Sequence, residues 1–252
     1  DSFSPTVRHT LLSTNTVQYI IEGERADGLH IRVEYLEYRD FPVTEWVAWI
    51  TNRGDKDTPI LSNIQLGGVL GCPSPILEHG TGDTCRDDGY HWQVDPITEE
   101  GLTVQTRGDG TSCNGAFPYM RLLGEGCGLN IAVGWPAMWQ ADFAPDGSGT
   151  RVAIGQKRCA TVLHPGETFR TPRLNLMIYT NDNAPYRGIN LWRSWYFKHI
   201  LPRENGQPIP PKLCMHLFMA DGKPEFTGAS EQNQIEALQT YLSRGVKPDV
   251  WW

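Results

Sequence analysis

The chain lacks both a long hydrophobic run and a cluster of basic residues. Its 252 residues contain no apolar stretch near the roughly 20 residues that a membrane-spanning helix needs, so we expect no membrane partner. Lys and Arg number 22 against 29 Asp and Glu, which gives a net charge of −7, and the basic residues form no run. Because contact with a phosphate backbone requires clustered Lys and Arg, we expect no nucleic-acid partner either.

Several catalytic fingerprints are also missing. There is no G-x-S-x-G nucleophile elbow, no P-loop and no dinucleotide-binding glycine pattern. Cys72, His79, Cys85 and His91 have side chains that suit zinc, but their gaps are longer than the short Cys-x-x-Cys pairs of structural zinc sites. We therefore predict no cofactor and no metal site.

Cysteine is present but sparse. Three cysteines lie in apolar, strand-like runs, where a free thiol behaves as a small core residue: Cys127, Cys159 and Cys214. The other three lie in loop-like regions and leave room for one bridge: Cys72, Cys85 and Cys113. We expect mostly free thiols. The chain starts at Asp1 without a charged-then-apolar leader, which leaves open a cytoplasmic location or a secreted or periplasmic one after removal of a signal.

Glycine and proline are abundant between short segments of alternating polarity. The chain holds 26 Gly and 18 Pro, which favours many turns. Residues 16–22 and 29–38 alternate apolar and polar side chains, which is typical of half-buried strands, and Asp27-Gly28 between them is a hairpin signal. Further strand-like stretches cover residues 41–51, 59–70, 128–135, 139–143, 151–156, 159–163 and 173–179. Short strands at this spacing predict a mainly β protein built as a large antiparallel sandwich.

Residues 71–118 interrupt this pattern with a polar, glycine-rich stretch that is dense in Asp, His, Cys and aromatic residues. Long stretches without regular structure are uncommon unless they are functional, so we expect this one to reach a ligand. Asp87 and Asp88 are adjacent there, and sugar hydrolysis usually needs a pair of carboxylates. Because neighbours in an extended chain point to opposite sides, the alternative is that both are solvated loop residues.

Nine tryptophans raise the question of which are exposed. Rings that lie in or beside polar turns are candidates for stacking on the C–H faces of sugars: Trp92, Trp135 and Trp139. Rings within apolar runs are expected to pack in the interior: Trp46, Trp49, Trp192 and Trp195.

The hydrophobic period then changes to that of a helix. Residues 189–201 place Trp192, Trp195, Tyr196 and His199 on one helical face, and Pro202 ends the segment. A proline-rich linker follows. We therefore expect a domain boundary near residue 205, with a sandwich and its linking helix in residues 1–205 and a second domain in residues 206–252.

The second domain reads as a strand, a loop, a helix and a strand. Residues 212–219 predict a buried strand, Ser230 suits a helix N-cap, and Gly245 suits the helix end. Val250, Trp251 and Trp252 suit a second strand. Because a strand–helix–strand unit needs further strands to cover it, we expect this chain to be the front part of a larger protein, cut inside its second domain.

Five stretches, in this order, resemble the α-galactosidase-type enzymes of glycoside hydrolase family 36. They read FPVTEWVAWITNRGDKDTPIL, GLNIAVGWPAMWQADF, LHPGETFRTPRLNLMIY, INLWRSWYFKHILP and SEQNQIEALQTYLSRGVKPDVWW. The first is similar to a family strand followed by an N-x-G-D-x-D-T-P-I-L turn, the fourth to the family's linking helix, and the last to the first helix and second strand of its barrel. Each stretch alone is a weak match, but their shared order from about residue 30 onward makes the resemblance specific.

The resemblance implies a β-supersandwich joined by the linking helix to a catalytic (β/α)8 barrel, of which this chain holds only the first β–α–β. The full enzyme would remove terminal α-linked galactose from an oligosaccharide with retention, using two Asp residues about 5–5.5 Å apart on later barrel strands. No catalytic residue is then expected in this chain. Working residues of such barrels lie at the C-terminal ends of strands. Together with the 71–118 stretch, this gives the candidate substrate-binding residues Asp87, Asp88, Trp92, His216, Asp221 and Trp252.

One stretch departs from the family pattern. Residues 215–219 read Met-His-Leu-Phe-Met where the family usually has a Trp near the end of the first barrel strand. The substrate is therefore open to a related α-linked sugar such as α-N-acetylgalactosamine. Two other roles remain as alternatives: a non-catalytic carbohydrate-binding sandwich, and a scaffold that mediates homo-oligomer contacts.

Overall fold

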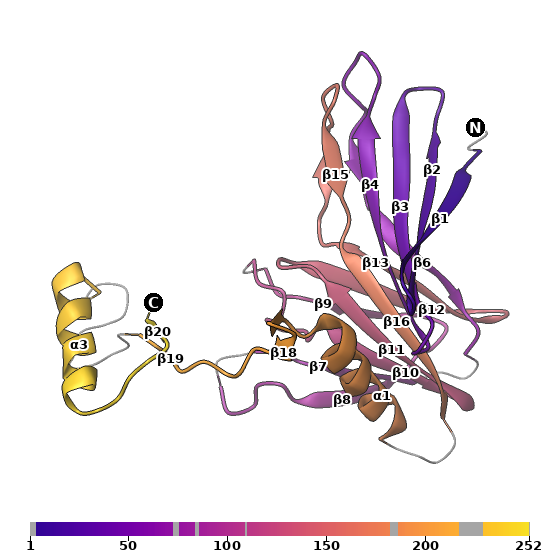
Figure 1. Cartoon of the computed structure of the whole chain (residues 1–252). Helices are drawn as coiled ribbons and strands as arrows, with labels where there is room; N and C mark the ends of the chain where they lie inside the picture. Colours follow the sequence, from indigo (N-terminus) through magenta and orange to yellow (C-terminus); the bar gives the residue numbers. More distant parts are fainter. Residues whose placement is uncertain are drawn as a thin grey trace. The chain divides into compact units, whose positions relative to one another are not determined.

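The computed structural model describes residues 4–72, 76–83, 86–108, 110–181, 186–216 and 229–251. The chain divides into two compact units, Asp1–Tyr196 and Phe197–Trp252, which are treated separately below. The larger unit is dominated by antiparallel strands, so the prediction of a mainly β sandwich is confirmed (Figure 1).

Ten strands form the larger sheet. In spatial order they are β1 (Thr6–Ser13), β2 (Thr16–Glu24), β3 (Leu29–Tyr38), β4 (Val43–Asn52), β16 (Arg173–Asn181), β11 (Gly126–Gly134), β10 (Tyr119–Gly124), β7 (Ile76–Gly80) and β8 (Trp92–Pro96), with β15 (Thr168–Arg170) also paired to β4. Every pairing in this sheet is antiparallel.

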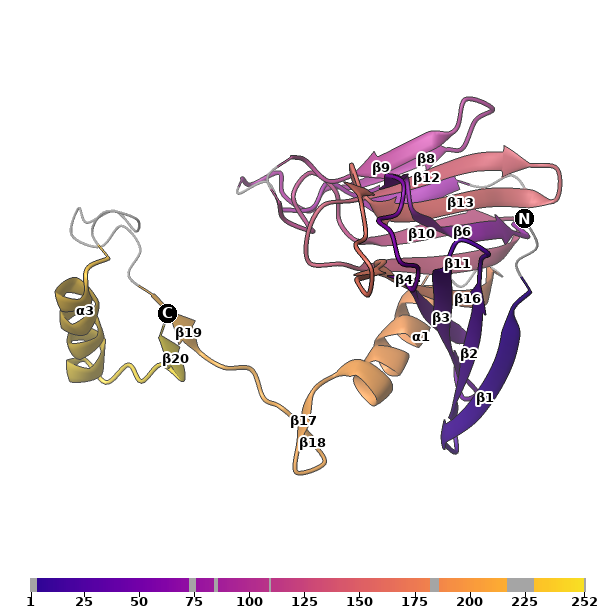
Figure 2. The same ribbon diagram turned by 90° about the horizontal axis from the view of Figure 1, so that it is seen from above.

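Four strands form the second sheet, in the order β6 (Gln65–Leu70), β13 (Gly149–Gln156), β12 (Trp139–Asp146) and β9 (Leu102–Gln105). A short pair, β5 (Leu61–Ser62) with β14 (Ala160–Thr161), lies apart from both sheets. The two large sheets pack face to face, as Figure 2 shows from above. Their inward side chains form one core, to which β10 contributes Leu122, β11 Ile131, β12 Phe143 and β13 Ile154.

The alternation of apolar and polar residues predicts strand positions accurately where a hairpin turn separates two strands. The predicted strand 29–38 has the same bounds as β3, and Asp27-Gly28 lies in the turn before it. Gly28 has φ +82°, and a Cβ at this position would lie 2.6 Å from the backbone nitrogen of Gly54. The turn therefore requires glycine for both its conformation and its close approach.

The 71–118 stretch contains more structure than expected. It includes β7, β8 and β9, so the expectation of one long irregular segment is wrong. These strands are short, and β8 exposes apolar Trp92 and Val94 as well as polar Gln93, so no alternation marks it in the sequence. The predicted strand 59–70 is also split, because Asn63 takes the left-handed conformation with φ 52° between β5 and β6.

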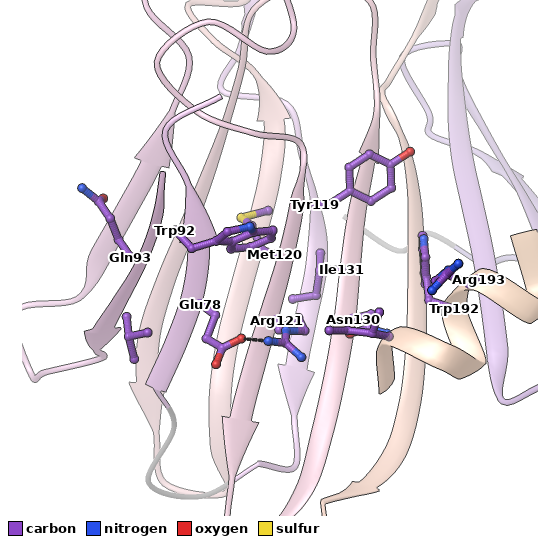
Figure 3. Close-up of a pocket in the computed structure, with 12 residues that line it drawn as sticks. Glu78, Trp92, Gln93, Tyr119, Met120, Arg121, Asn130, Ile131, Trp192 and Arg193 are labelled. Atoms are coloured by element: carbon purple, nitrogen blue, oxygen red, sulfur yellow. Dashed lines mark ion pairs between the residues drawn. The ribbon is translucent and has the colours of Figure 1, made fainter. Parts of the chain in front are cut away.

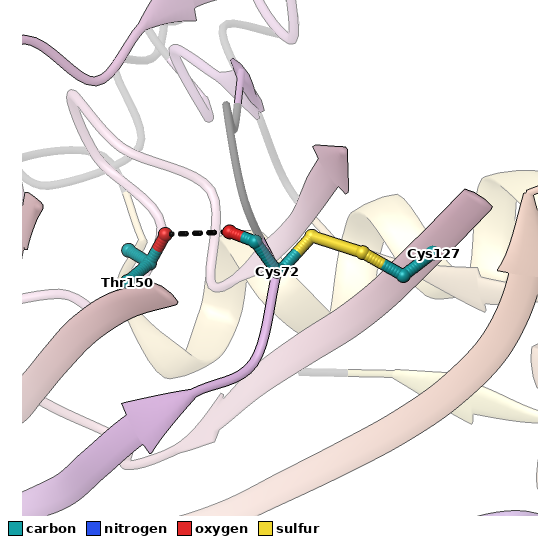
Figure 4. Close-up of a disulfide and its surroundings, with 3 residues drawn as sticks. All are labelled: Cys72, Cys127 and Thr150. Atoms are coloured by element: carbon teal, nitrogen blue, oxygen red, sulfur yellow. Dashed lines mark hydrogen bonds between the residues drawn. A yellow bond between two sulfur atoms is a disulfide. The ribbon is translucent and has the colours of Figure 1, made fainter. Parts of the chain in front are cut away.

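The expectation of mostly free thiols agrees with the described cysteines, but the interpretation of Cys127 as a free core thiol is wrong. A disulfide joins Cys72, two residues after β6, to Cys127 in β11, and so links the two sheets (Figure 4). Cys72 is fully buried, and its carbonyl oxygen accepts a hydrogen bond from Thr150 Oγ1 at 3.3 Å. Among the described residues, Cys113, Cys159 and Cys214 are free thiols. Cys127 reads as an ordinary core residue because its partner lies 55 positions away and is adjacent only after the sheets pack.

Helix α1 (Arg187–Trp195) packs on the larger sheet and continues as a π-helical turn, η1 (Tyr196–Ile200), before Pro202. The sequence predicts one regular helix over 189–201, so the change at Tyr196 was not foreseen. Gly188 allows the close approach to the sheet, since a Cβ there would lie 2.3 Å from Cζ of Tyr179. Gly128, opposite Tyr179 in the sheet, makes the same close approach to that ring, so the ring lies between two glycines.

The smaller unit contains a parallel strand pair with a helix between the two strands in sequence. β19 (Cys214–Met215) pairs in parallel with β20 (Val250–Trp251), and α3 (Glu231–Ser243) connects them. Ser230 caps α3 as predicted, because its Oγ accepts from the backbone nitrogen of Asn233 at 3.3 Å. Gly245 ends the helix with φ 81°. This unit also contains the hairpin of β17 (Arg203–Glu204) and β18 (Gln207–Pro208).

The strand predicted over 212–219 is only partly seen. Residues 217–219 lie outside the described residues, and β19 covers two positions. Cys214 in β19 is exposed, so the prediction of burial is wrong for this residue. No residue of α3 is buried, and its Tyr241 contacts the ring of Trp251 in β20 at 5.9 Å.

Candidate functional site

A groove of about 570 Å³ lies on the larger sheet beside α1 (Figure 3). We call it the outer-face groove. Its lining comes from five elements: Glu78 of β7; Trp92, Gln93 and Val94 of β8; Tyr119, Met120 and Arg121 of β10; Asn130 and Ile131 of β11; and Ile189, Trp192 and Arg193 of α1.

Strand alternation explains which side chains reach this groove. Leu77, Leu122 and Leu129 point into the core between the sheets. Side chains one position along a strand point to the opposite face. The register places Glu78 opposite Arg121, and Arg121 opposite Asn130, in one row across three strands. This row forms the floor of the outer-face groove.

A charged pair occupies this floor. Arg121 and Glu78 form an ion pair, and their side chains are 23% and 20% exposed. Asn130 lies beside them and is 6% exposed. Little water reaches this pair. Polar groups of a ligand can therefore form hydrogen bonds with the carboxylate and guanidinium that water would otherwise supply.

Aromatic rings form one wall of the outer-face groove. Consecutive ring contacts run from Trp92 to Phe117, to Tyr119 and to Trp192, with centroid separations of 6.2, 5.2 and 5.9 Å. The row continues from Trp192 to Trp195 at 4.8 Å. Burial raises the pKa of the Tyr119 hydroxyl, with a smaller contribution from Tyr196, so this hydroxyl is neutral and able to donate at physiological pH.

Trp195 anchors α1 beneath this wall. It is 1% exposed and contacts the ring of Tyr38 at 5.4 Å, which confirms its predicted packing role. Burial is the main cause that raises the pKa of Tyr38, and the nearby carboxylate of Glu45 raises it further. Trp46, Trp49 and Trp192 are half-buried. Because Trp195 is buried one turn further along α1, the helix holds Trp192 in place at the groove.

The predicted site residues do not gather at one place. Trp92 lines the groove and is 50% exposed, as expected. Asp87 and Asp88 are exposed in the turn before β8 and do not line the groove. His216 belongs to the smaller unit and is half-buried. Asp221 and Trp252 lie outside the described residues.

Of the other two candidate rings, Trp135 is half-buried, and Trp139 is not available for stacking on a sugar. Trp139 has no exposed surface, because it packs in the core between the sheets. Its indole nitrogen donates to the carbonyl oxygen of Ser112 at 2.7 Å, which satisfies the polar atom in this position.

Sequence reasoning missed the groove's floor and its helical side: Glu78, Arg121, Asn130, Trp192 and Arg193. A weak signal existed for Arg121, a charge between the apolar Met120 and Leu122. No pattern indicated that β7 pairs with β10, and this pairing is what brings Glu78 to Arg121.

The described residues contain no group of three or more His, Cys, Asp or Glu that would hold a metal ion. Of the four zinc-type residues noted in the sequence, Cys72 is in the disulfide and His79 bonds Asp95 at 2.8 Å. None of the helices in the described ranges has the length and hydrophobicity to cross a membrane.

Comparison with known proteins gives structural matches only. No family model matches the chain, and no curated protein matches it by sequence. The α-galactosidase from Lactobacillus brevis is similar, with a TM-score of 0.67 at 14% identity over 98% of this chain and 35% of that chain. The family 36 α-galactosidase AgaA from Geobacillus stearothermophilus gives 0.66 at 16% identity over 95% of this chain and 34% of its own.

The galactosidase domain of an α-galactosidase–sucrose kinase, AgaSK, gives a TM-score of 0.69 at 14% identity, with 99% of this chain and 36% of that chain covered. The chain therefore has the fold found in part of these family 36 α-galactosidases, as the sequence resemblance predicts. It spans about a third of their length. Variants of the Geobacillus enzyme AgaA have been crystallised with stachyose and with raffinose.

Proposed function

We propose that this chain is the N-terminal part of a retaining glycoside hydrolase that removes terminal α-linked galactose or a related α-sugar from oligosaccharides. One observation carries the proposal. The likeness to α-galactosidases extends over 95–99% of the chain, and so includes the parallel β19–α3–β20 unit as well as the sandwich. A free-standing sandwich would have no need for such a unit.

In this proposal the chain contributes a scaffold and the first strands of a barrel. Residues 1–205 form the supersandwich with its linking helix, and residues 206–252 begin the (β/α)8 barrel. Retention requires a nucleophilic carboxylate and an acid–base carboxylate about 5–5.5 Å apart. We assign both to later barrel strands of the parent protein. His216, Asp221 and Trp252 then belong to the substrate end of the barrel, since each lies at or after the end of a strand.

The activity is tested on the parent polypeptide with 4-nitrophenyl α-galactoside, raffinose and stachyose. We expect hydrolysis, and NMR of the first product should show the α-anomer of galactose. The same assay with 4-nitrophenyl α-N-acetylgalactosaminide decides between the two sugars. The 252-residue chain alone should be inactive. Turnover by that chain, or a β-anomeric first product, would contradict the proposal.

A second role, oligomer formation, is favoured by the edge strand β1. All eight of its residues are exposed, and Val7, Leu11 and Leu12 each expose more than half of their surface. A long exposed edge with apolar side chains is a template for pairing with another chain. Sedimentation of the parent protein with Val7 and Leu11 changed to Lys tests this role. An unchanged oligomeric state would exclude β1 as a contact.

A further inference from the structure

We propose that the outer-face groove binds a neutral oligosaccharide, with Trp92 and Trp192 flanking the sugar and the Glu78–Arg121 pair bonding its hydroxyls. The groove lies wholly in the larger unit. The inference rests on the proposed function only for the choice of a galactose-containing probe.

The dimensions of the groove suit such a ligand. Its volume of about 570 Å³ lies within the usual range for small-molecule sites. Trp92 stands on the outermost strand, β8, and α1 contacts β11, three strands further in. Three strand spacings correspond to roughly 14 Å. Figure 3 shows Trp92 and Trp192 apart from each other, with the ion pair beneath Trp92. This separation between the strands exceeds the width of a single six-membered ring.

The chemistry of the lining matches the two faces of a sugar. Trp92 and Trp192 offer flat apolar surfaces for C–H groups, and the half-exposed Trp92 needs little rearrangement to be used. Glu78 accepts hydrogen bonds and Arg121 donates them, so together they complement adjacent hydroxyls, each of which both donates and accepts.

The charge of the groove favours a neutral ligand over an anion. Glu78 and Arg121 compensate each other at the floor. Arg193 adds one further positive charge, but it lies on the exposed side of α1, where water screens it.

An apolar peptide segment is a poorer occupant. It would cover Glu78 and Arg121 without supplying hydrogen bonds, and Arg121 is the only ion-pair partner of Glu78 among the described residues. Removing such a pair from water without replacing its hydrogen bonds is costly. Sugar hydroxyls replace those bonds directly.

The test is titration of the 252-residue chain with raffinose, followed by tryptophan fluorescence and calorimetry. Sorbitol serves as a hydroxyl-rich control without a ring, and galacturonic acid as an anionic sugar. We expect saturable binding of raffinose and none of sorbitol. Trp92→Ala and Glu78→Gln should each weaken binding about tenfold or more, since each removes an interaction worth about 1.4 kcal/mol or more.

Phe197→Ala is the matched control, because that ring is 55% exposed and does not line the groove. Its affinity should equal that of the unmodified chain, and thermal unfolding should show that all variants fold. The proposal is overturned if raffinose does not bind, if only galacturonic acid binds, or if Trp92→Ala and Phe197→Ala bind alike. Loss of the Trp92-dependent part of the binding in the longer parent protein would also overturn it, because the groove would then be an internal contact surface.

This test separates the two proposals. Raffinose binding that depends on Trp92, in a parent protein that hydrolyses no α-galactoside, would retain the groove and reject the proposed function. Hydrolysis without Trp92-dependent raffinose binding would retain the proposed function and reject the groove as a sugar site.

Discussion

Asn130 donates a hydrogen bond from Nδ2 to the carbonyl oxygen of Gly188 at 2.8 Å, and so ties α1 to the larger sheet. The bond is buried, and both residues lie beside the groove. The position of the helix therefore depends on an amide in β11 and on a glycine whose missing side chain leaves room for Tyr179.

Gly188→Ala should displace α1 from the sheet. Its new Cβ would lie 2.3 Å from Tyr179 Cζ, a contact that cannot be accommodated without movement of the helix or the ring. Although Ala favours helices over Gly, overpacking should dominate and lower the free energy of unfolding by about 1–3 kcal/mol. Denaturant titration measures this loss, and raffinose affinity should fall with it. Gly68→Ala is the control, since nothing lies within 4 Å of its added Cβ; equal effects of both changes would argue against this account.

Replacing Cys72 and Cys127 with Ala should destabilise the sandwich. The disulfide closes a loop across a sequence separation of 55, and loss of that constraint on the unfolded chain corresponds to about 4 kcal/mol. Dithiothreitol should lower the unfolding midpoint of the unmodified chain but not of the double variant. Cys159→Ala, which removes a free thiol, should change the midpoint little. A midpoint insensitive to dithiothreitol in the unmodified chain would indicate that the bridge is absent in solution.

Asn52→Ala should open the turn that follows β4. Asn52 is 1% exposed, and its Nδ2 donates to the carbonyl oxygens of Lys56 at 2.7 Å and Leu163 at 2.8 Å. Its Oδ1 accepts from the backbone nitrogen of Gly54 at 3.0 Å. Losing these bonds should cost about 2–4 kcal/mol in unfolding free energy. Asn190→Ala, at an exposed position of α1, should stay within about 0.5 kcal/mol.

Stability should depend on pH through His164. A hydrogen bond from its ring to Asp57, at 2.8 Å, raises the pKa of His164, and the charges of Asp57 and Glu167 raise it further. Because the folded pKa lies above the unfolded value of about 6.5, the stabilisation is fully present below that pH and is lost as pH rises through the folded pKa. Asp57→Asn should therefore be more destabilising at pH 5.5 than at pH 9. Thermal unfolding of both proteins at the two pH values measures this, and a larger effect at pH 9 would refute the assignment.

The sequence predicted the sandwich because its long strands alternate cleanly. β2 and β3 carry enough residues for the period of two to emerge, and Gly28 marks the turn between them. The strands β7 to β9 were missed because they are only four or five residues long. The π-helical turn after Trp195 was missed because its residues suit an ordinary helix equally well.

Most residues that line the groove could not be predicted from the sequence, for a different reason. Trp92 was found because a tryptophan in a polar segment is conspicuous in sequence. Glu78 and Arg121 are unremarkable surface-type residues until β7 pairs with β10. Trp192 was expected to pack in the core, and only the position of α1 shows that it also faces the groove. Long-range pairing, which local pattern does not encode, assembles this site.

The place of β16 between β4 and β11 bears on how the chain is made. The first four strands are sequential neighbours and can pair as soon as they leave the ribosome. The edge of β4 that faces away from β3 stays unpaired longer, because its partner β16 is synthesised more than a hundred residues later. During that interval Trp46 and its neighbours on β4 have no partner strand on that side. Synthesis thus leaves an unpaired apolar edge open for several seconds at about 5–20 residues per second, a period in which a chaperone that shields nascent strands would have the most effect.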